Sequence, residues 1–141
     1  MMKNVAPKIR VELVLIFDND TKMQMVTQEI GLLPTACKDK ENQRKSPFSG
    51  EKMEAYWRFS TGNRRTFCLE EVTGAIVAEI KPYLKKVKKI LERCDGEAKF
   101  YVVSIFSSFY TPALYMNQEF LEVVNFLGAP VELDVYVEED F

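Results

Sequence analysis

Seven polar or aromatic side chains alternate with apolar residues along three short stretches of the chain. They are Arg10, Glu12, Tyr56, Arg58, Glu132, Asp134 and Tyr136. Successive side chains of a strand point to opposite faces, so these residues would share one sheet face if the strands lie side by side. Guanidinium, carboxylate and phenol groups on such a face form cross-strand ion pairs, and the same mixture is typical of protein-contact surfaces. A solvated sheet face is the plainer interpretation, and a protein-interaction surface is the functional one.

Catalytic chemistry has little support in the residue types. The chain of 141 residues contains no histidine, which removes the most frequent general base, the most frequent metal ligand and the usual partner of a Ser or Cys nucleophile. The glycines lack the spacing of a phosphate-binding loop. Adjacent carboxylates such as Glu70-Glu71 fall on different faces of their element and do not form an acid–base pair. We therefore predict no catalytic, cofactor-binding or metal-binding residues and a protein that is not an enzyme.

Charge is distributed unevenly along the chain. All 19 basic residues precede Phe100, whereas seven carboxylates and no Lys or Arg follow from there to the end. The acidic residues 132–140 suit a basic protein partner, or they form a solvated strand followed by a frayed tail. Residues 81–93 carry six positive charges on a helical pattern, but the net charge of −2 favours a solvent-facing helix over a nucleic-acid partner.

The totals predict one domain over residues 1–141. No segment resembles a signal peptide or a membrane span, so we expect a cytoplasmic protein without a membrane partner. Cys37, Cys68 and Cys94 are odd in number and widely spaced, which favours reduced, mostly structural thiols. The sequence does not specify an oligomeric state.

Hydrophobic periodicity predicts the elements that position the candidate surface. Strands are expected over residues 9–17, 54–61, 99–107 and 131–137, with a short edge strand over 113–116. Helices are expected over residues 23–30, 69–80, 82–94 and 118–127, with residues 18–21 as cap and turn. Residues 35–53 form a long polar loop, and residues 1–8 and 138–141 are expected to fray.

A strand, a turn, a helix ending in glycine and a return strand occur over residues 9–61 and again over 98–138. The order favours an α+β fold with a mostly antiparallel sheet and helices packed on one face. The arrangement is ferredoxin-like, and its two halves suggest a duplication.

The order of the turn and helix signals also resembles the bacterial domain-of-unknown-function 4279 family across nearly the whole chain. The residues that carry the resemblance are Ile30-Gly31-Leu32-Leu33-Pro34-Thr35, Trp57 followed by Ser60-Thr61-Gly62, Leu69-Glu70-Glu71 with Pro82, Thr111-Pro112-Ala113-Leu114, and Leu127-Gly128. Members commonly have a Lys-Gly turn after the Pro-Thr, where this chain has Cys37-Lys38-Asp39-Lys40. The resemblance implies an α+β fold and a bacterial cytoplasmic protein, and it implies no activity.

Three functions remain open. The first is a non-catalytic protein-binding module, such as an immunity-type inhibitor that neutralises a toxin. The second is a small-ligand or regulatory domain that binds between the sheet and the loop of residues 35–53. The third is an enzyme that uses carboxylates.

Overall fold

Strand β1 (Lys8–Phe17) lies in the middle of the sheet and alternates strictly between buried and half-buried residues. Its buried side chains are Ile9, Val11, Leu13, Leu15 and Phe17. Burying one row of β-branched and large apolar side chains fixes which face of the strand meets the core, because a one-residue slip would expose the whole row.

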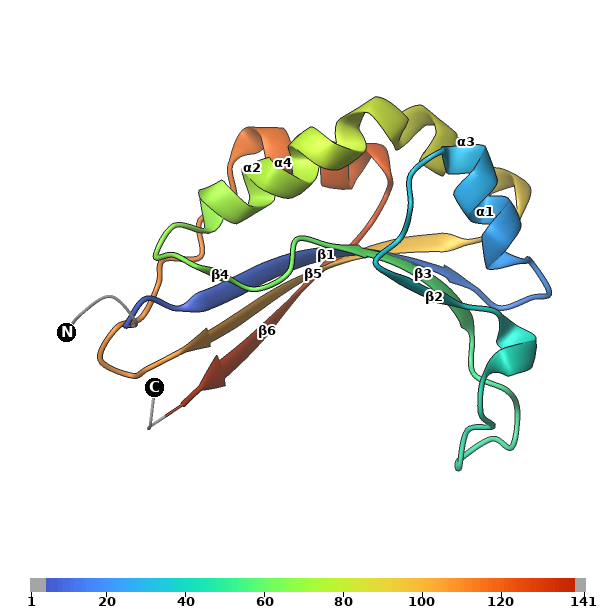
Figure 1. The fold of residues 1–141 in the computed structure, drawn as a ribbon, viewed down its shortest axis with the longest axis horizontal. Helices are drawn as coiled ribbons and strands as arrows, with labels where there is room; N and C mark the ends of the chain where they lie inside the picture. The colour runs from blue at the N-terminus through green and yellow to red at the C-terminus, as the bar shows by residue number, and fades with distance from the viewer. Residues whose placement is uncertain (1–4, 139–141) are drawn as a thin grey trace.

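The computed structural model describes residues 5–138 and contains a six-stranded sheet (Figure 1). The other strands are β2 (Ala36–Lys38), β3 (Ala55–Ser60), β4 (Arg64–Arg65), β5 (Glu97–Phe106) and β6 (Val131–Val137). Their order is β2-β3-β1-β5-β6, and β4 pairs with the start of β1. All pairs are antiparallel except β5–β6, which is parallel and is connected through helix α4 (Gln118–Phe126).

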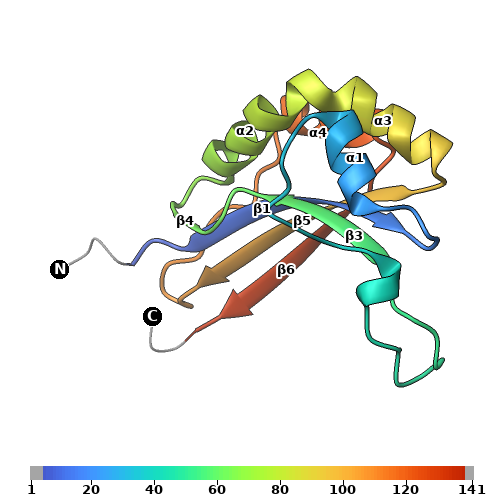
Figure 2. The same cartoon turned by 45° about the vertical axis from the view of Figure 1, so that its right-hand side comes forward.

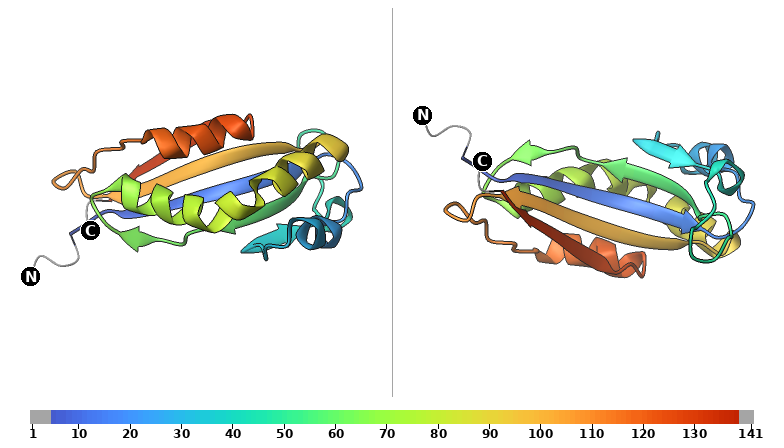
Figure 3. Two further views of the ribbon diagram at one scale, coloured as in Figure 1. Left: turned by 90° about the horizontal axis from the view of Figure 1, so that it is seen from above. Right: turned by 90° about the horizontal axis from the view of Figure 1, so that it is seen from below.

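The helices cover one face of the sheet and leave the other open, as the views from above and below show (Figure 3). They are α1 (Met23–Ile30), α2 (Leu69–Ile80), η2 (Lys81–Tyr83), α3 (Leu84–Arg93) and α4. Pro82 lies in η2 between α2 and α3, where its missing N–H is tolerated. Trp57 of β3 is fully buried, and Phe100 of β5 meets Phe120 of α4 edge-on with ring centroids 5.4 Å apart.

The expected fold class is confirmed, since the sheet is mostly antiparallel and its helices pack on one face. The two halves nevertheless pair differently. Strands β1 and β3 are antiparallel neighbours, whereas β5 and β6 are parallel neighbours. The strand that follows α1 is β2, which runs parallel to β1 because both are antiparallel to β3, and β3 lies between them. No strand lies between β5 and β6, so the structure does not show a simple duplication.

Two local expectations are corrected. Residues 113–116 do not form an edge strand, because Ala113 makes only an isolated bridge with Cys68. Residues 18–21 do not cap α1 directly. Its N-cap is Lys22, which makes no side-chain cap, and the carboxylate of Asp39 accepts the Met23 N–H at 2.8 Å instead. Of the three free cysteines, Cys37 and Cys68 are exposed.

Residues 35–53, expected as a polar loop, include β2 and a short 3-10 turn, η1 (Lys40–Asn42). The segment from residue 39 to 54 projects below the open face of the sheet (Figure 2). Its two arms are held together by hydrogen bonds from Ser46 N to Glu51 O at 2.7 Å and from Met53 N to Arg44 O at 3.1 Å. Of the ends expected to fray, residues 1–4 and 139–141 lie outside the described chain. Lys8 belongs to β1, and Glu138 N donates to Phe106 O.

Candidate functional site

The open face of the sheet carries all seven residues singled out from the sequence. Strand alternation places them opposite the helices, and the pairing registers set them in rows across the sheet. One row runs from Arg10 through Val103 to Asp134, and the next from Glu12 through Tyr101 to Glu132. Tyr56 and Arg58 extend the face onto β3, and Tyr136 extends it along β6.

Glu12 forms the centre of a charged cluster on this face. Its carboxylate lies 3.5 Å from Arg10 Nε and 4.0 Å from Arg58 Nε, and its side chain is only 14% exposed. The Arg58 guanidinium also lies 5.9 Å from the centre of the Tyr56 ring. Among the described residues, Arg58 Nε is buried and finds no hydrogen-bond acceptor. The cluster therefore contains an N–H donor that has no acceptor among the described residues.

A second cluster spans β5 and β6. Lys99 Nζ lies 2.8 Å from a Glu132 carboxylate oxygen and 4.7 Å from the centre of the Tyr101 ring. The hydrogen bond from Lys99 lowers the pKa of Glu132 below its usual value. Glu132 in turn raises the pKa of Asp134, because the two carboxyl groups share a hydrogen bond and repel each other when both are ionised.

A groove of about 600 Å³ lies between this face and the base of the projecting segment. Five of the seven predicted residues line it: Arg10, Glu12, Tyr56, Arg58 and Asp134. Glu132 and Tyr136 lie on the same face but outside the groove. Residues outside the seven complete it: Val14, Ile16, Ala55, Tyr101 and Val103 from the sheet, and Gln43, Arg44, Met53 and Glu54 from the segment. Residues 43, 44 and 53 belong to the loop 35–53, beside which the small-ligand alternative placed its site.

The missed residues differ in whether the sequence carried a signal for them. Lys99, Tyr101 and Val103 alternate on one side of β5, so their shared face follows from the strand period once β5 is placed beside β1. That strand is apolar on both sides, a pattern typical of burial on both faces, so the sequence does not mark one of its faces as open. The segment residues have no comparable signal, because loop conformation does not follow from a periodic pattern.

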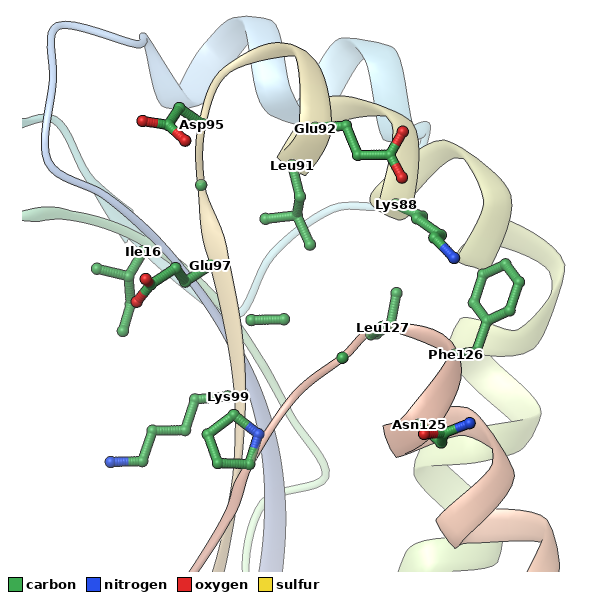
Figure 4. A pocket seen from close by; sticks show the side chains of 14 residues that line it. Ile16, Lys88, Leu91, Glu92, Asp95, Glu97, Lys99, Asn125, Phe126 and Leu127 are labelled. Carbon is green, nitrogen blue, oxygen red and sulfur yellow. The ribbon is translucent and has the colours of Figure 1, made fainter.

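A second hollow, of about 640 Å³, lies between the C-terminal ends of α3 and α4 and the start of β5 (Figure 4). Lys88 reaches across it to the Phe126 ring, with its Nζ 4.7 Å from the ring centre. Leu91, Leu127 and Gly128 are among the other residues that line it. Its charged residues are exposed except Lys99, which is already paired with Glu132, and they do not converge on one point, so we assign it no chemistry.

Residues 5–138 contain no group of three or more His, Cys, Asp or Glu side chains arranged to hold a metal ion. No helix in the same range has the length and apolar character needed to cross a membrane.

The geometry defines an α+β protein with helices on one sheet face and a charged, tyrosine-containing groove on the other. The chain belongs to the family described as Domain of unknown function (DUF4279), whose model matches residues 7–138. The resemblance deduced from the turn and helix signals is therefore confirmed. No curated protein and no solved structure matches the chain.

Proposed function

We propose that this chain is a non-catalytic protein-binding module that holds a partner against the open face of its sheet. The supporting observation is the concentration of Tyr, Arg and carboxylate side chains on the one sheet face that no helix covers. Tyr and Arg are enriched at protein interfaces because each combines a large contact area with directed hydrogen bonding.

The electrostatics of the face suit recognition of a polar partner. Glu12 holds Arg10 and Arg58 in place, so little side-chain entropy is lost when a partner contacts them. The buried Nε of Arg58 lacks an acceptor, so a partner carbonyl or carboxylate that reorients this side chain would supply the missing hydrogen bond. An inhibitor that covers the active surface of a toxin is one form of such a module. A bacterial cytoplasm is the compartment we propose, and three free cysteines suit its reducing conditions.

Affinity capture followed by light scattering of the purified complex tests this function. The double substitution Tyr56→Ala with Arg58→Ser should abolish a stoichiometric complex, while Lys86→Glu on the exposed side of α3 should leave it intact. Higher salt should weaken the complex, because charged contacts are screened. A complex of unchanged affinity in the double variant would place the partner elsewhere and contradict the proposal.

A second function, binding of a small ligand, is supported by the part that residues 43, 44, 53 and 54 play in the groove. Its volume of about 600 Å³ lies in the range of about 300–1,000 Å³ typical of ligand sites. Apolar Val14, Ile16 and Val103 line it together with the charged residues. A metabolite that raises the melting temperature of the wild-type protein, but not that of the Arg58→Ser variant, would favour this function over a protein partner.

A further inference from the structure

Strand β6 forms one outer edge of the sheet. Within residues 5–138 it pairs only with β5, and Figure 3 shows its other side free of any neighbouring strand. An unpaired edge presents a row of backbone donors and acceptors that another strand can extend.

The hydrogen-bond pattern identifies which residues of β6 form that row. At one end of the β5–β6 ladder, Phe100 N donates to Pro130 O, and at the other Glu138 N donates to Phe106 O. Pro130 and Glu138 flank β6, and both have even numbers. Because backbone groups alternate in direction along a strand, the even-numbered residues point their N–H and C=O toward β5 and the odd-numbered ones point them outward. The free row therefore belongs to Val131, Leu133, Val135 and Val137.

Three of these four residues are exposed although they are apolar, and Val131 is half-buried. Leu133, Val135 and Val137 are 45%, 46% and 57% exposed, on the helix side of the strand. On the opposite side β6 carries Glu132, Asp134 and Tyr136. Edge strands are normally protected by charged residues, especially lysine, or by proline. β6 contains neither lysine nor proline, and its charged residues are Glu132 and Asp134, which repel an acidic strand but not a basic one.

Charge argues against a second copy of this chain as the occupant. If β6 paired antiparallel with itself about Asp134, that carboxylate would face its own copy. Pairing about Leu133 would set Glu132 opposite Asp134, and pairing about Val135 would set Glu132 opposite Glu138. Like charges directly opposite each other destabilise a sheet.

We propose that β6 accepts an extended segment of a partner protein as an additional strand, and that this segment alternates apolar residues with Lys or Arg. Its apolar side chains cover Leu133, Val135 and Val137, while its basic side chains lie opposite Glu132 and Asp134. A cation there offsets the repulsion between these two carboxylates, of which only Glu132 forms an ion pair with Lys99. The inference rests on the proposed function only in treating the chain as a protein-binding module, because the backbone edge of β6 lies outside the groove and only Asp134 borders both.

A fluorescent seven-residue peptide alternating Val and Lys is the probe, with binding followed by anisotropy at low salt. Val135→Pro removes one outward N–H and no bond to β5, a replacement that edge strands tolerate. We expect at least about tenfold weaker binding, from the lost hydrogen bond and the disturbed edge around it. Val135→Thr retains the N–H and the branched shape, and it should bind within about threefold of wild type. A peptide with Glu in place of Lys should not bind.

Peptide variants make the test independent of the folding of Val135→Pro. N-methylation of alternate peptide residues should abolish binding to the wild-type protein for the set facing β6 and spare it for the other set. The proposal would be overturned if both N-methylated peptide sets bound equally well. It would also be overturned if Val135→Pro bound the peptide as well as wild type does, or if the Glu peptide bound as well as the Lys peptide. So would a wild-type dimer that Val135→Pro dissociates, since the occupant would then be a second copy. Tyr56→Ala with Arg58→Ser should retain peptide binding, so this proposal and the proposed function fail in distinguishable ways.

Discussion

At the scale of single residues, Asp134 has the least favourable electrostatic surroundings on the open face. Glu132 is the main cause, since the carboxyl pair raises the pKa of Asp134, and Lys99 and Arg10 offset this only in part. A carboxyl group whose pKa is higher in the folded than in the unfolded chain binds its proton more tightly when folded. Its ionisation therefore lowers stability as pH rises through the folded pKa.

Asp134→Asn should accordingly raise the melting temperature at neutral pH, because it removes a charge that Glu132 repels. The gain should shrink as the pH falls and Asp134 becomes protonated in the wild-type protein. Melting curves of both proteins across the acidic range measure the effect. Glu122→Gln, an exposed position on α4, serves as the control. A gain that grows toward low pH would contradict the argument.

Replacing Gly96 or Gly74 with alanine should change the unfolding free energy in opposite directions. A Cβ on Gly96 would lie 2.7 Å from Phe17 Cδ1 and 3.1 Å from Leu91 Cδ2, and Phe17 is fully buried. Gly96→Ala should therefore cost about 1–3 kcal/mol of unfolding free energy through overpacking. Gly74, inside α2, has open space around such a Cβ, so Gly74→Ala should add about 0.5–1 kcal/mol. Denaturant unfolding of both variants measures the difference, and equal effects would be inconsistent with the packing at Gly96.

At the scale of elements, α4 depends on its first residues. The Asn117 side chain accepts the Phe120 N–H at 3.0 Å, and Phe120 is fully buried against Phe100. Asn117→Ala should cost about 1 kcal/mol of unfolding free energy, since one N-terminal N–H of the helix loses its acceptor. Asn117→Asp keeps an acceptor at the same position and should stay close to wild type. Urea denaturation distinguishes the two, and an equally destabilised Asp variant would point to another role for Asn117.

The elements that sequence reasoning predicted well are those with a long hydrophobic period or a strong stop signal. Strand β1 follows from its alternation, and the helices end where Gly31, Pro82 and Gly128 interrupt them. Strand β2 has three residues, too few for a period, and it forms because β3 offers it an edge. The capping of α1 by Asp39 joins residues 16 positions apart. Neither feature has a local signature.

The candidate face was predictable only in part, because contacts between distant segments have no local signature in the sequence. All seven predicted residues lie on it, because strand alternation decides the face that a side chain shares. Which strands are neighbours depends on pairing between distant segments. Only the structure therefore shows that Lys99, Tyr101 and Val103 lie on this face, and which residues of the segment 43–54 line the groove.

At the scale of the whole molecule, the projecting segment lies apart from the core. Phe48 near its tip is 98% exposed, and residues 45 and 52 form an isolated bridge at its neck. Replacing residues 46–51 with Asn-Gly should leave unfolding free energy within about 0.5 kcal/mol of wild type, because five of these residues are exposed, Ser46 is half-buried and none belongs to the core. Equilibrium unfolding checks this expectation. A large loss would show that the tip stabilises the fold.

Trimming the tip also separates the two proposed functions. The groove-lining residues 43, 44, 53 and 54 remain, so a small ligand should bind as before. A partner protein that engages Phe48 should bind more weakly, since an exposed phenylalanine is a large apolar contact area.

The hydrogen bond from Met23 N to Asp39 ties the first turn of α1 to the start of the segment that walls the groove. Helix α1 and the groove lie on opposite faces of the sheet. If that segment shifts when the groove is occupied, the Asp39 carboxylate moves with it, and the amide of Met23 loses or gains protection from solvent deuterium. Helix α1 would then report occupancy of a surface that it does not touch.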